Sequence, residues 1–586
     1  MDQPIEENSK VHNLRHSMAH LLAQAVHDLY PEVQMGVGPV IEHGFYYDFL
    51  KKEPFTPEDL KKIYKKMKEF SKNKFPIEKI NMSDAEKSSY FSKQPLKKEL
   101  YDEFLAEGET VTFYKQGDFI DLCRGGHVEN TKELKHYKLT KSSGAYWRGD
   151  SKNIQLQRIY GVGFESADEL KAHMEMLRLA DQRNHKKLGE ELELFAHFDL
   201  IGKGLPVWLP KGEIMRKEIE KYAIEMEDKA GYNRVSTPHL AKEELFLKSG
   251  HLPYYADSMY PCMEMDDGKY YLKAMNCPLH HLIFGRKVRS YKELPLRIAE
   301  YGTCYRNELS GTLNGLLRVR ILRMNDAHIY CMKEQMEQEL ENVLNMIKEY
   351  FDTLGLEHYW FRLSLWDPEK TDKFLNEPEN WEFAEQVLRK VLKKLKLNFN
   401  EEIGEAAFYG PKIDVQFKNV YGREETMSTV QLDFIAKDRF NLHYDDAEGK
   451  QSKEVFVIHR APLSTHERFM AFLIEHFGGK FPLWLSPVQV KIMTVTDRSN
   501  EFADKVALKF KENGVRIDVD LRNESIAKKV RDGIKQKVNY LITIGDKETE
   551  NKTLAVRDRD GNVEQDVKID NFVTNILEEI KRKDVK

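Results

Sequence analysis

The chain has 586 residues, far more than one hydrophobic core accommodates, so we expect several domains. A hydrophobic content of 41%, only five cysteines, no apolar run of membrane-spanning length and no signal peptide exclude a membrane protein and a disulfide scaffold, and they predict a cytoplasmic location. The net charge of -5 excludes a generally basic nucleic-acid-binding protein, so any RNA contact must come from local patches.

The first predicted element is a helix over residues 11–30, where apolar residues recur at helical spacing and end before Pro31. His12, His16 and His20 are four residues apart and therefore share one face of this helix. A single histidine on a helix is usually structural, whereas a pair at this spacing can share a metal ion or a substrate.

A second group of candidate ligands lies further along the chain. Cys123 and His127 flank two glycines that follow a predicted strand and would let the backbone approach a ligand closely. Together with His16 and His20 they offer four ligands of the types that zinc prefers. From these residues alone, a metal-dependent hydrolase is one interpretation.

Two helices are predicted next. Residues 166–194 are charged, helical in period and nearly free of Gly and Pro, which is typical of a helix that connects domains. Residues 212–230 form an amphipathic pattern, followed by Gly231 and an extended run that ends at Pro238. An ordinary surface helix with an edge strand would have the same pattern.

Residues 300–331 alternate apolar and polar side chains on both sides of a group of turn formers, which predicts two antiparallel strands joined by a loop. We expect Arg306 and Glu308 to share a face of the first strand, and Arg318 and Arg320 to share a face of the second. Arginine binds phosphate in a bidentate manner, so this hairpin could hold a nucleoside triphosphate. A solvated charged hairpin is the alternative.

The region after Pro487 alternates strands and helices, with a strand at 488–493, a helix near 499–513 and a strand at 515–519. This order predicts a compact α/β domain. The following helix carries a group of basic residues that forms either a local basic surface or an ordinary solvated face. They are Lys528, Lys529, Arg531, Lys535 and Lys537.

Two motifs carry a resemblance to a known family. The sequence YRNE at 305–308, followed by Arg318, resembles motif 2 of class II aminoacyl-tRNA synthetases, and NDAH at 325–328 is similar to its threonine-specific form. The sequence IHRAPL at 458–463, leading to Glu467 and Arg468, resembles motif 3. By this resemblance, from about residue 12 to the C-terminus, the chain is identified as a member of the bacterial-type threonyl-tRNA synthetase family.

The resemblance implies an α+β multidomain fold with a class II antiparallel-sheet catalytic core. It places an α+β editing domain at 1–165, a linker helix at 166–194, the catalytic domain at 195–485 and an α/β anticodon-binding domain at 486–586. The family usually has a ubiquitin-like domain before the editing domain, which we expect to be missing here or supplied elsewhere. The 212–230 helix resembles motif 1, which implies a homodimer.

Matching the family motifs assigns the catalytic domain. The residues implied to bind ATP, with Mg²⁺, are Arg306, Glu308, Arg318, Lys412, Thr429 and Arg468. Those implied to bind L-threonine are Asp326, Tyr409 and Gln431, and those implied to bind one Zn²⁺ are Cys277, His328 and His459. Arg306 and Arg468 are the implied catalytic residues, with His251 beside the tRNA terminus.

The implied zinc site explains why the family needs an editing domain. Three protein ligands leave a zinc position open for the amino and hydroxyl groups of threonine, and valine lacks that hydroxyl. Serine loses only a methyl group, worth about 1–3 kcal/mol, so it passes the synthetic site. The family hydrolyses seryl-tRNA without needing a metal. The residues implied to line the editing pocket are His16, His20, Cys123, His127, Asp121, Lys97 and Tyr47.

The implied function is ATP-dependent threonine activation, transfer to the 3′ end of tRNA(Thr), and hydrolytic editing of seryl-tRNA(Thr). Asn523, Glu548 and Arg557 are implied to contact the anticodon. One alternative is the metal-dependent hydrolase above, which leaves motifs 2 and 3 unexplained. Another is a catalytically altered paralogue that acts as an RNA-binding or regulatory protein, although the zinc ligands and both arginines favour an active enzyme.

Four departures from the family pattern surround the implied site. Met324 stands where glutamine is usual, and Arg323 is expected to add a charge near the substrate. Leu279 and Ser464 stand where glycine is usual. We therefore expect an active enzyme whose substrate contacts have altered surroundings.

Overall fold

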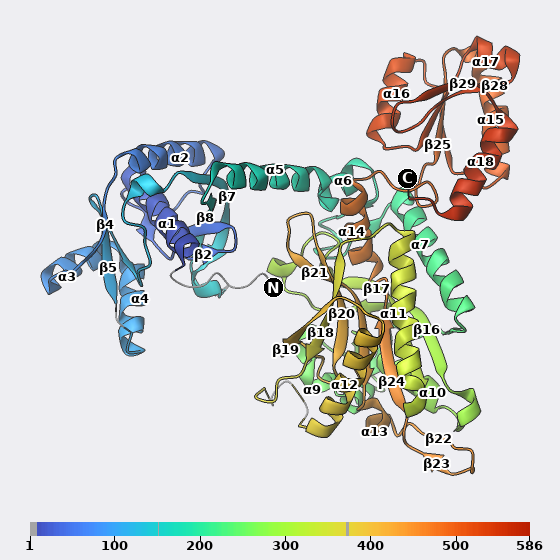
Figure 1. Ribbon diagram of the computed structural model, residues 1–586, viewed down its shortest axis with the longest axis horizontal. Helices are drawn as coiled ribbons and strands as arrows, with labels where there is room; N and C mark the ends of the chain where they lie inside the picture. Colours follow the sequence, from blue (N-terminus) through green and yellow to red (C-terminus); the bar gives the residue numbers. More distant parts are fainter. Residues whose placement is uncertain (1–8, 110, 151, 371–373, 375, 586) are drawn as a thin grey trace. The chain divides into compact units, whose positions relative to one another are not determined.

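The computed structural model describes residues 9–109, 111–150, 152–370, 374 and 376–585 (Figure 1). The chain divides into two compact units, Met1–Arg178 and Leu179–Lys586. Each unit contains its own buried apolar clusters. Among the described residues, no helix is both long and apolar enough to cross a bilayer.

In the first unit, helix α1 (Lys10–Leu29) packs on an antiparallel sheet with the order β1-β3-β8-β7, to which β2 is added beside β3. Ser9 begins the helix because its hydroxyl accepts the N–H of His12 at 3.2 Å. The apolar face of α1 is buried, with Met18, Leu21 and Leu22 fully covered. The strands are β1 (Gln34–Met35), β2 (Val40–Ile41), β3 (Gly44–Leu50), β7 (His136–Tyr146) and β8 (Gln155–Phe164).

A second antiparallel sheet, β4-β5-β6, completes the first unit. Its last strand ends at Cys123, and Gly125 and Gly126, with φ of 99° and 79°, turn the chain away from it. The remaining elements are β4 (Ile77–Ile80), β5 (Thr112–Gln116), β6 (Phe119–Cys123), α2 (Pro57–Lys72), α3 (Asp84–Lys93) and α4 (Pro95–Ala106).

The second unit is built on one large sheet. Within the described residues, eight strands follow the order β11-β16-β17-β24-β21-β20-β18-β19, antiparallel except for the outer pairs β11/β16 and β18/β19. The strands are β11 (Asn233–Arg234), β16 (Leu296–Tyr305), β17 (Ile321–Cys331), β24 (Phe456–Ala461), β21 (Glu424–Asp433), β20 (Lys412–Lys418), β18 (Tyr359–Leu365) and β19 (Phe399–Ile403).

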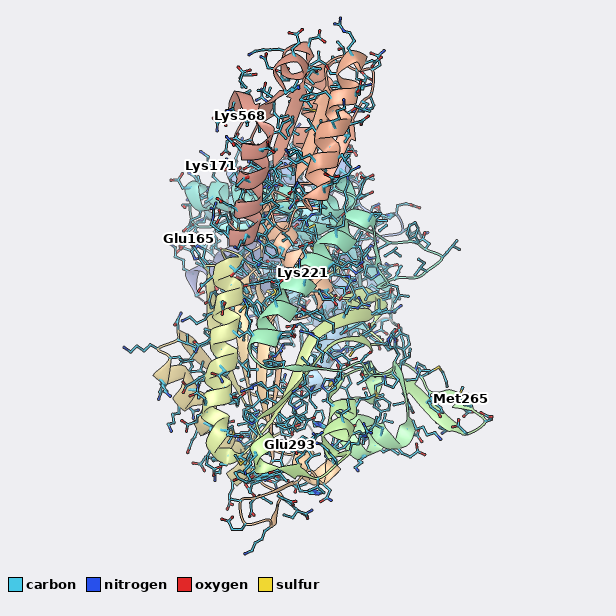
Figure 2. The ribbon with its side chains drawn as sticks, turned by 90° about the vertical axis from the view of Figure 1, so that its right-hand side faces the viewer. Glu165, Lys171, Lys221, Met265, Glu293 and Lys568 are labelled. Atoms are coloured by element: carbon cyan, nitrogen blue, oxygen red, sulfur yellow. The ribbon has the colours of Figure 1, made fainter. Side chains whose placement is uncertain are left out.

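One face of this sheet is covered by a helical layer, which joins its apolar side chains in one core. The helices are α7 (Pro210–Lys229), α11 (Met336–Thr353), α12 (Pro378–Lys394) and α14 (His466–Phe477). Helix α7 is amphipathic as predicted, since Met215 and Ile219 are buried while Lys221 points outward (Figure 2). The other face is open to the site described below.

Smaller elements surround the sheet. A three-stranded sheet, β12-β14-β13, carries the exposed Met265 in its hairpin (Figure 2), and three short strands form the sheet β15-β22-β23. The bounds are β9 (Phe195–Ala196), β10 (Val207–Trp208), β12 (Leu240–Lys242), α8 (Glu243–Ser249), α9 (His251–Tyr254), β13 (Met263–Met265), β14 (Gly268–Leu272), α10 (Cys277–Gly285), β15 (Arg289–Ser290), α13 (Ala436–Phe440), β22 (Tyr444–Asp445) and β23 (Gln451–Ser452).

The predicted 300–331 hairpin is confirmed as the antiparallel pair β16/β17, but the placement of its arginines was wrong. Arg306 and Glu308 follow the end of β16, and Arg318 and Arg320 precede β17, so all four lie in the connecting loop. The N–H of Arg306 still donates to the carbonyl of Arg320 at 2.9 Å. The N–H of Arg320 turns away to the carbonyl of Gly204 at 2.7 Å, and regular pairing therefore stops there.

The prediction of a single connecting helix at 166–194 was also wrong. The chain forms α5 (Ala167–Arg183) and α6 (His185–Glu191), which are separated at Asn184. The side chain of Asn184 accepts the N–H of Lys186 at 2.9 Å and so caps a new helix in place of continuing the old one.

The C-terminal region forms the predicted α/β domain, with the strand order β26-β25-β27-β28-β29. The prediction that Lys529 belongs to the basic surface was wrong, because Lys529 is buried and donates to the carbonyls of Thr494 and Asp520. The elements are β25 (Val490–Thr494), α15 (Asn500–Glu512), β26 (Ile517–Asp520), α16 (Ile526–Lys535), β27 (Tyr540–Ile544), α17 (Asp546–Asn551), β28 (Thr553–Arg557), β29 (Val563–Lys568) and α18 (Ile569–Arg582).

Candidate active site

Four predicted site residues form a row across the open face of the large sheet. His328 of β17 pairs with His459 of β24, His459 pairs with Gln431 of β21, and Gln431 pairs with Lys412 of β20. Directly paired residues project from the same face of a sheet, as do residues two apart along a strand. Asp326 and Thr429 therefore join this face as well.

Cys277, His328 and His459 lie together in the structure, although spacing alone does not connect them. All three are buried, and their sulfur and ring nitrogen atoms lie within 4.8 Å of one another. One thiolate and two imidazoles are a donor set that zinc accepts with a fourth position open. Asp433 lies 2.9 Å from Nε2 of His459 and fixes that ring.

Further residues that the sequence did not reveal hold His328. Its Nδ1 lies 2.8 Å from Nδ1 of His280, and Nε2 of His280 lies 3.2 Å from the carboxylate of Glu300. Glu300 in turn accepts the N–H of Thr237 at 2.7 Å. This series of hydrogen bonds orients the His328 ring, as hydrogen-bonding partners of the ligands do at metal sites. The one available sequence signal is that His280 stands one helical turn after Cys277.

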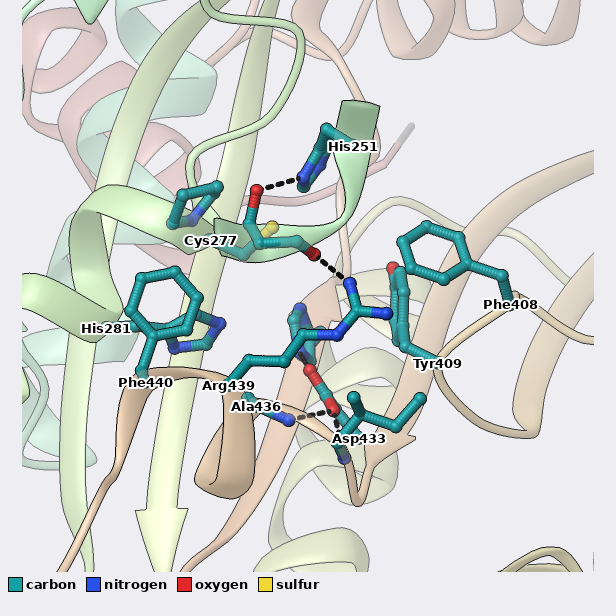
Figure 3. A pocket seen from close by; sticks show the side chains of 13 residues that line it. His251, Cys277, His281, Phe408, Tyr409, Asp433, Ala436, Arg439 and Phe440 are labelled. Atoms are coloured by element: carbon teal, nitrogen blue, oxygen red, sulfur yellow. Dashed lines mark hydrogen bonds and ion pairs between the residues drawn. The ribbon is translucent and has the colours of Figure 1, made fainter. Parts of the chain in front are cut away.

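A small cavity of about 20 Å³ borders the cluster and is lined by His251, Cys277, Tyr409, Asp433 and His459, among others (Figure 3). The Tyr409 ring stacks on His459 with 5.1 Å between centroids. Its hydroxyl donates to the side-chain oxygen of Gln431. These contacts bring two of the predicted threonine-binding residues together beside the cluster.

The third predicted threonine-binding residue, Asp326, is buried and accepts a hydrogen bond from Nδ2 of Asn276 at 2.9 Å. Asn276 directly precedes Cys277, so the carboxylate is held next to the ligand cluster. Phe434 is buried, whereas Phe408 is half-buried and lines the small cavity.

His251 belongs to the wall of this cavity. Its Nδ1 lies 2.8 Å from the hydroxyl of Ser249 (Figure 3), while its buried Nε2 has no hydrogen-bonding partner among the described residues. Burial and the nearby Arg439 lower the pKa of His251 to about 4, so the ring is neutral at neutral pH. A neutral imidazole with a free Nε2 can accept a proton.

All six predicted ATP-binding residues line a second pocket of about 380 Å³. Nε of Arg318 lies 2.8 Å from Glu308, whereas Nε of Arg306 is buried without a partner among the described residues. Burial and the charges of Arg306 and Arg318 lower the pKa of Arg468. Closely spaced guanidinium groups with unused donors fit a polyphosphate.

The far wall of this pocket depends on Asp414, which the sequence did not reveal. This buried carboxylate lies 2.6 Å from Nζ of Lys412 and accepts the hydroxyl of Thr429. Arg362 and Ser364 also bond to it at 2.9 Å. Asp414 therefore fixes two of the predicted ATP-binding residues, which β20 and β21 supply.

In the first unit, a pocket of about 570 Å³ is lined by Tyr47, Lys97, Asp121 and most of the predicted editing residues. The ligand atoms of His16, His20, Cys123 and His127 lie within 4.8 Å of one another. Burial and Asp121 raise the pKa of Cys123 to about 12, so its thiol is neutral. The four donors can hold a metal ion only after that thiol loses its proton.

Asp121 organises this pocket. It pairs with Nζ of Lys97 at 2.6 Å, accepts the hydroxyl of Tyr47 and lies 3.8 Å from His20. Sequence reasoning missed Tyr90, whose hydroxyl donates to Asp121 at 3.4 Å, because its surroundings have no motif character.

The three predicted anticodon residues do not gather in one pocket. Asn523 and Glu548 follow β26 and β27 at the carboxyl edge of the parallel strands. Arg557 pairs with Leu541 near the opposite end of β27 and donates to the carbonyl of Gly561 at 2.9 Å. Glu548 caps its own helix by accepting the N–H of Gly545 at 2.9 Å.

Three family models match the chain. They are the tRNA synthetase class II core domain (G, H, P, S and T) at residues 260–477, the anticodon binding domain at 489–579, and the threonyl and alanyl tRNA synthetase second additional domain at 111–160. The chain is 46% identical to the threonine–tRNA ligase of Staphylococcus saprophyticus, over 97% of this chain and 88% of that protein. It is also 46% identical to threonine–tRNA ligase 1 of Bacillus subtilis, over 97% and 89%.

The chain belongs to the threonyl-tRNA synthetase family.

Solved structures agree with the assignment to the threonyl-tRNA synthetase family. A threonyl-tRNA synthetase RNA-binding domain from Cryptosporidium parvum matches with a TM-score of 0.64 and 32% identity, over 68% of this chain and 98% of that one. A putative threonyl-tRNA synthetase from Aeropyrum pernix matches with a TM-score of 0.61 and 28% identity, over 68% and 96%. The class II core, editing-type and anticodon-binding domains expected from the sequence are all present.

The structure places the four departures from the threonyl-tRNA synthetase pattern. Met324 lines the 380 Å³ pocket, whereas Arg323 projects from the opposite face of β17, where its charge acts on Glu213 and Glu220. The expectation that Arg323 adds a charge near the substrate was therefore wrong. Ser464 has a φ of 51°, a conformation that favours glycine, and Leu279 is buried.

Proposed function

We propose that the chain is a threonine–tRNA ligase that also edits. It activates threonine with ATP, transfers the threonyl group to the 3′ end of tRNA(Thr), and hydrolyses seryl-tRNA(Thr). The observation that carries this proposal is the sheet face itself. In a chain of this family, a Cys-His-His cluster and a cationic pocket meet along one row of side chains.

In the first step, the threonine carboxylate attacks the α-phosphorus of ATP, pyrophosphate leaves, and threonyl-adenylate forms. Arg306 and Arg468 are proposed to neutralise the charge that develops on the phosphates, and Lys412, Thr429 and Glu308 to position the nucleotide. Mg²⁺ would enter with ATP as part of the substrate. Asp326 is proposed to hold the substrate ammonium beside Tyr409 and Gln431.

Cys277, His328 and His459 are proposed to hold one zinc ion per subunit, because their donor types and the fixed rings of both histidines fit it. When bound, zinc supplies an open position for the threonine amino and hydroxyl groups. In the second step, the tRNA ribose hydroxyl attacks the carbonyl carbon of the adenylate and AMP leaves, and Nε2 of His251 is proposed to accept the hydroxyl proton.

In the first unit, the pocket around Asp121 is proposed to hydrolyse the seryl ester. Burial lowers the pKa of His16, His20 and His127, so these neutral rings can accept a proton from the attacking water. Lys97 and Tyr47 are proposed to hold the substrate through their shared partner Asp121.

The assembly and location follow from the family and remain proposals. We propose a homodimer formed through α7 and β11, and a cytoplasmic location, which five free cysteines support. Asn523, Glu548 and Arg557 are proposed to contact the anticodon from separate points along the C-terminal sheet.

The test is amino-acid-dependent ATP–pyrophosphate exchange with threonine, serine and valine, together with zinc analysis. We expect exchange with threonine, weaker exchange with serine and almost none with valine. Cys277→Ala should lose the zinc and the exchange. Cys304→Ala is the matched control, because that buried thiol contacts Asn276 but lies outside the ligand cluster. Zinc without exchange would favour the RNA-binding paralogue.

A further inference from the structure

The first residues of helix α6 contact three segments of the second unit. Nδ1 of His185 donates to the carboxylate of Glu475 at 2.7 Å, and its Nε2 accepts the N–H of Leu316 at 3.2 Å. The adjacent Asn184 donates from Nδ2 to the hydroxyl of Tyr421 at 2.9 Å. Since the N–H of Leu316 is a donor, Nε2 carries no proton, and the second ring nitrogen carries it.

Each of these contacts is made to a segment that supplies a different wall of the 380 Å³ pocket. Leu316 directly precedes Leu317 and Arg318, which line the pocket from the loop between β16 and β17. Glu475 lies on α14, the helix that presents Arg468. Tyr421 lies in the turn between β20 and β21, the strands that present the pocket residues Lys412 and Thr429.

The loop is held closely at this point. A Cβ atom on Gly315, whose φ is +52°, would lie 2.3 Å from Nε2 of His185, so the loop backbone rests directly on the imidazole. On its other side, Nε of Arg468 donates to the carbonyl of Leu317 at 3.3 Å. His185 is 1% exposed and Leu316 is fully buried, so without the imidazole the N–H of Leu316 would lack a partner.

We propose that His185, assisted by Asn184, is a positioning residue that keeps the three walls of the ATP pocket in register. This inference rests on the proposed ATP-binding role of that pocket. The threonine site is held by separate contacts, from His280 to His328 and from Asp433 to His459. Loss of His185 therefore weakens ATP binding and leaves threonine binding in place.

The test compares His185→Asn with His185→Gln. Asparagine keeps a donor near the position of Nδ1 but is too short to accept the N–H of Leu316, whereas the longer glutamine places its oxygen near the position of Nε2. We expect the KM for ATP in threonine-dependent exchange to rise about tenfold for His185→Asn, with the KM for threonine within twofold. His185→Gln should recover most of the ATP affinity.

Two further variants sharpen the test. His476→Asn is the matched control, since His476 lies on α14 beside Glu475 and its ring stacks on Phe472 at 5.8 Å. It should leave both KM values unchanged. Tyr421→Phe removes only the hydroxyl that Asn184 contacts, and it should raise the KM for ATP about threefold even if His185→Asn folds poorly.

An unchanged KM for ATP in both His185→Asn and Tyr421→Phe would overturn the proposal, as would equal rises in both KM values. Binding of Mg-ATP by equilibrium dialysis, without threonine, separates this proposal from the proposed function. A wild type that binds ATP but shows no threonine-dependent exchange removes the function, while the ratio of wild-type to variant ATP affinity still decides the role of His185. A wild type that binds no ATP removes both.

Discussion

His251 combines three properties of a proton acceptor: a neutral ring, a free Nε2 and a place at the wall of the cavity beside the Cys277 cluster. Because the proposed mechanism forms the adenylate without a proton transfer to this residue, His251→Ala should slow threonyl transfer to tRNA about 100-fold and leave pyrophosphate exchange within twofold. Rapid-quench measurement of the two steps checks this.

The control is Ser249→Ala, which removes the hydroxyl beside Nδ1 and should have a smaller effect on transfer. The pKa of about 4 has its own consequence, because the imidazole stays neutral from pH 8 to pH 6 and causes no loss of transfer rate over that range. Equal losses in both chemical steps of His251→Ala would assign the residue to substrate binding instead.

Glu467 supplies a pH dependence of stability. Burial raises the pKa of Glu467 from 4.5 to about 7. The N–H of Arg323, which donates to this carboxylate at 3.0 Å, opposes the rise. The folded chain therefore keeps a proton that the unfolded chain releases near pH 4.5. The resulting stability is complete below pH 4.5 and is lost as the pH rises to about 7, with an upper bound of about 3 kcal/mol.

Glu467→Gln has no charge at any pH, so we expect it to unfold at higher urea than wild type at pH 8 and at similar urea at pH 5. Urea midpoints at the two pH values measure this. Glu382→Gln, at an exposed position of α12, is the matched control and should follow wild type. The assignment fails if Glu467→Gln keeps the wild-type pH dependence.

At the scale of elements, one carboxylate ties helix α7 to the two strands that carry the site. Glu227 is fully buried, forms an ion pair with Nη2 of Arg460 on β24 at 2.7 Å, and accepts a hydrogen bond from Nδ2 of Asn325 on β17 at 2.9 Å. Both partners directly neighbour site residues, Arg460 beside His459 and Asn325 beside Asp326. The same interaction therefore fixes the backbone beside the Cys277 cluster and the proposed threonine site.

Removing this carboxylate leaves the guanidinium of Arg460 buried and unpaired. We expect Glu227→Ala to lower the free energy of unfolding by about 3–5 kcal/mol, measured by urea denaturation. Glu225→Ala, at an exposed position of the same helix, should change it little. A loss below about 1 kcal/mol for Glu227→Ala would mean that the surrounding structure or water compensates Arg460.

The elements also mark the limits of sequence-based prediction. The β16/β17 pairing was predictable because alternation is local, but the ends of the strands depend on a hydrogen bond from Arg320 to the distant Gly204. The break at Asn184 depends on a side-chain cap within a helical pattern. Asp414 and Asp433 stand in no recognised motif role, and only the strand register brings them to the site.

At the scale of the whole molecule, the division into two units predicts that the first unit can fold and act without the second. The 570 Å³ pocket lies entirely within Met1–Arg178, which has its own core. Residues 1–178 expressed alone should unfold cooperatively in urea and hydrolyse seryl-tRNA(Thr). The kcat/KM should fall about 100-fold, because this fragment lacks the proposed anticodon contacts. The Asp121→Asn fragment, in which Lys97 loses its charged partner, should be inactive. A folded but inactive wild-type fragment would contradict the prediction.

The row that runs from His328 through His459 and Gln431 to Lys412 depends on the exact number of residues in each strand. Deleting one residue inside β24 before His459 would turn this proposed zinc ligand toward the helices and bring Arg460 to the face that carries the proposed active site. The central strands can therefore exchange residues but cannot gain or lose one.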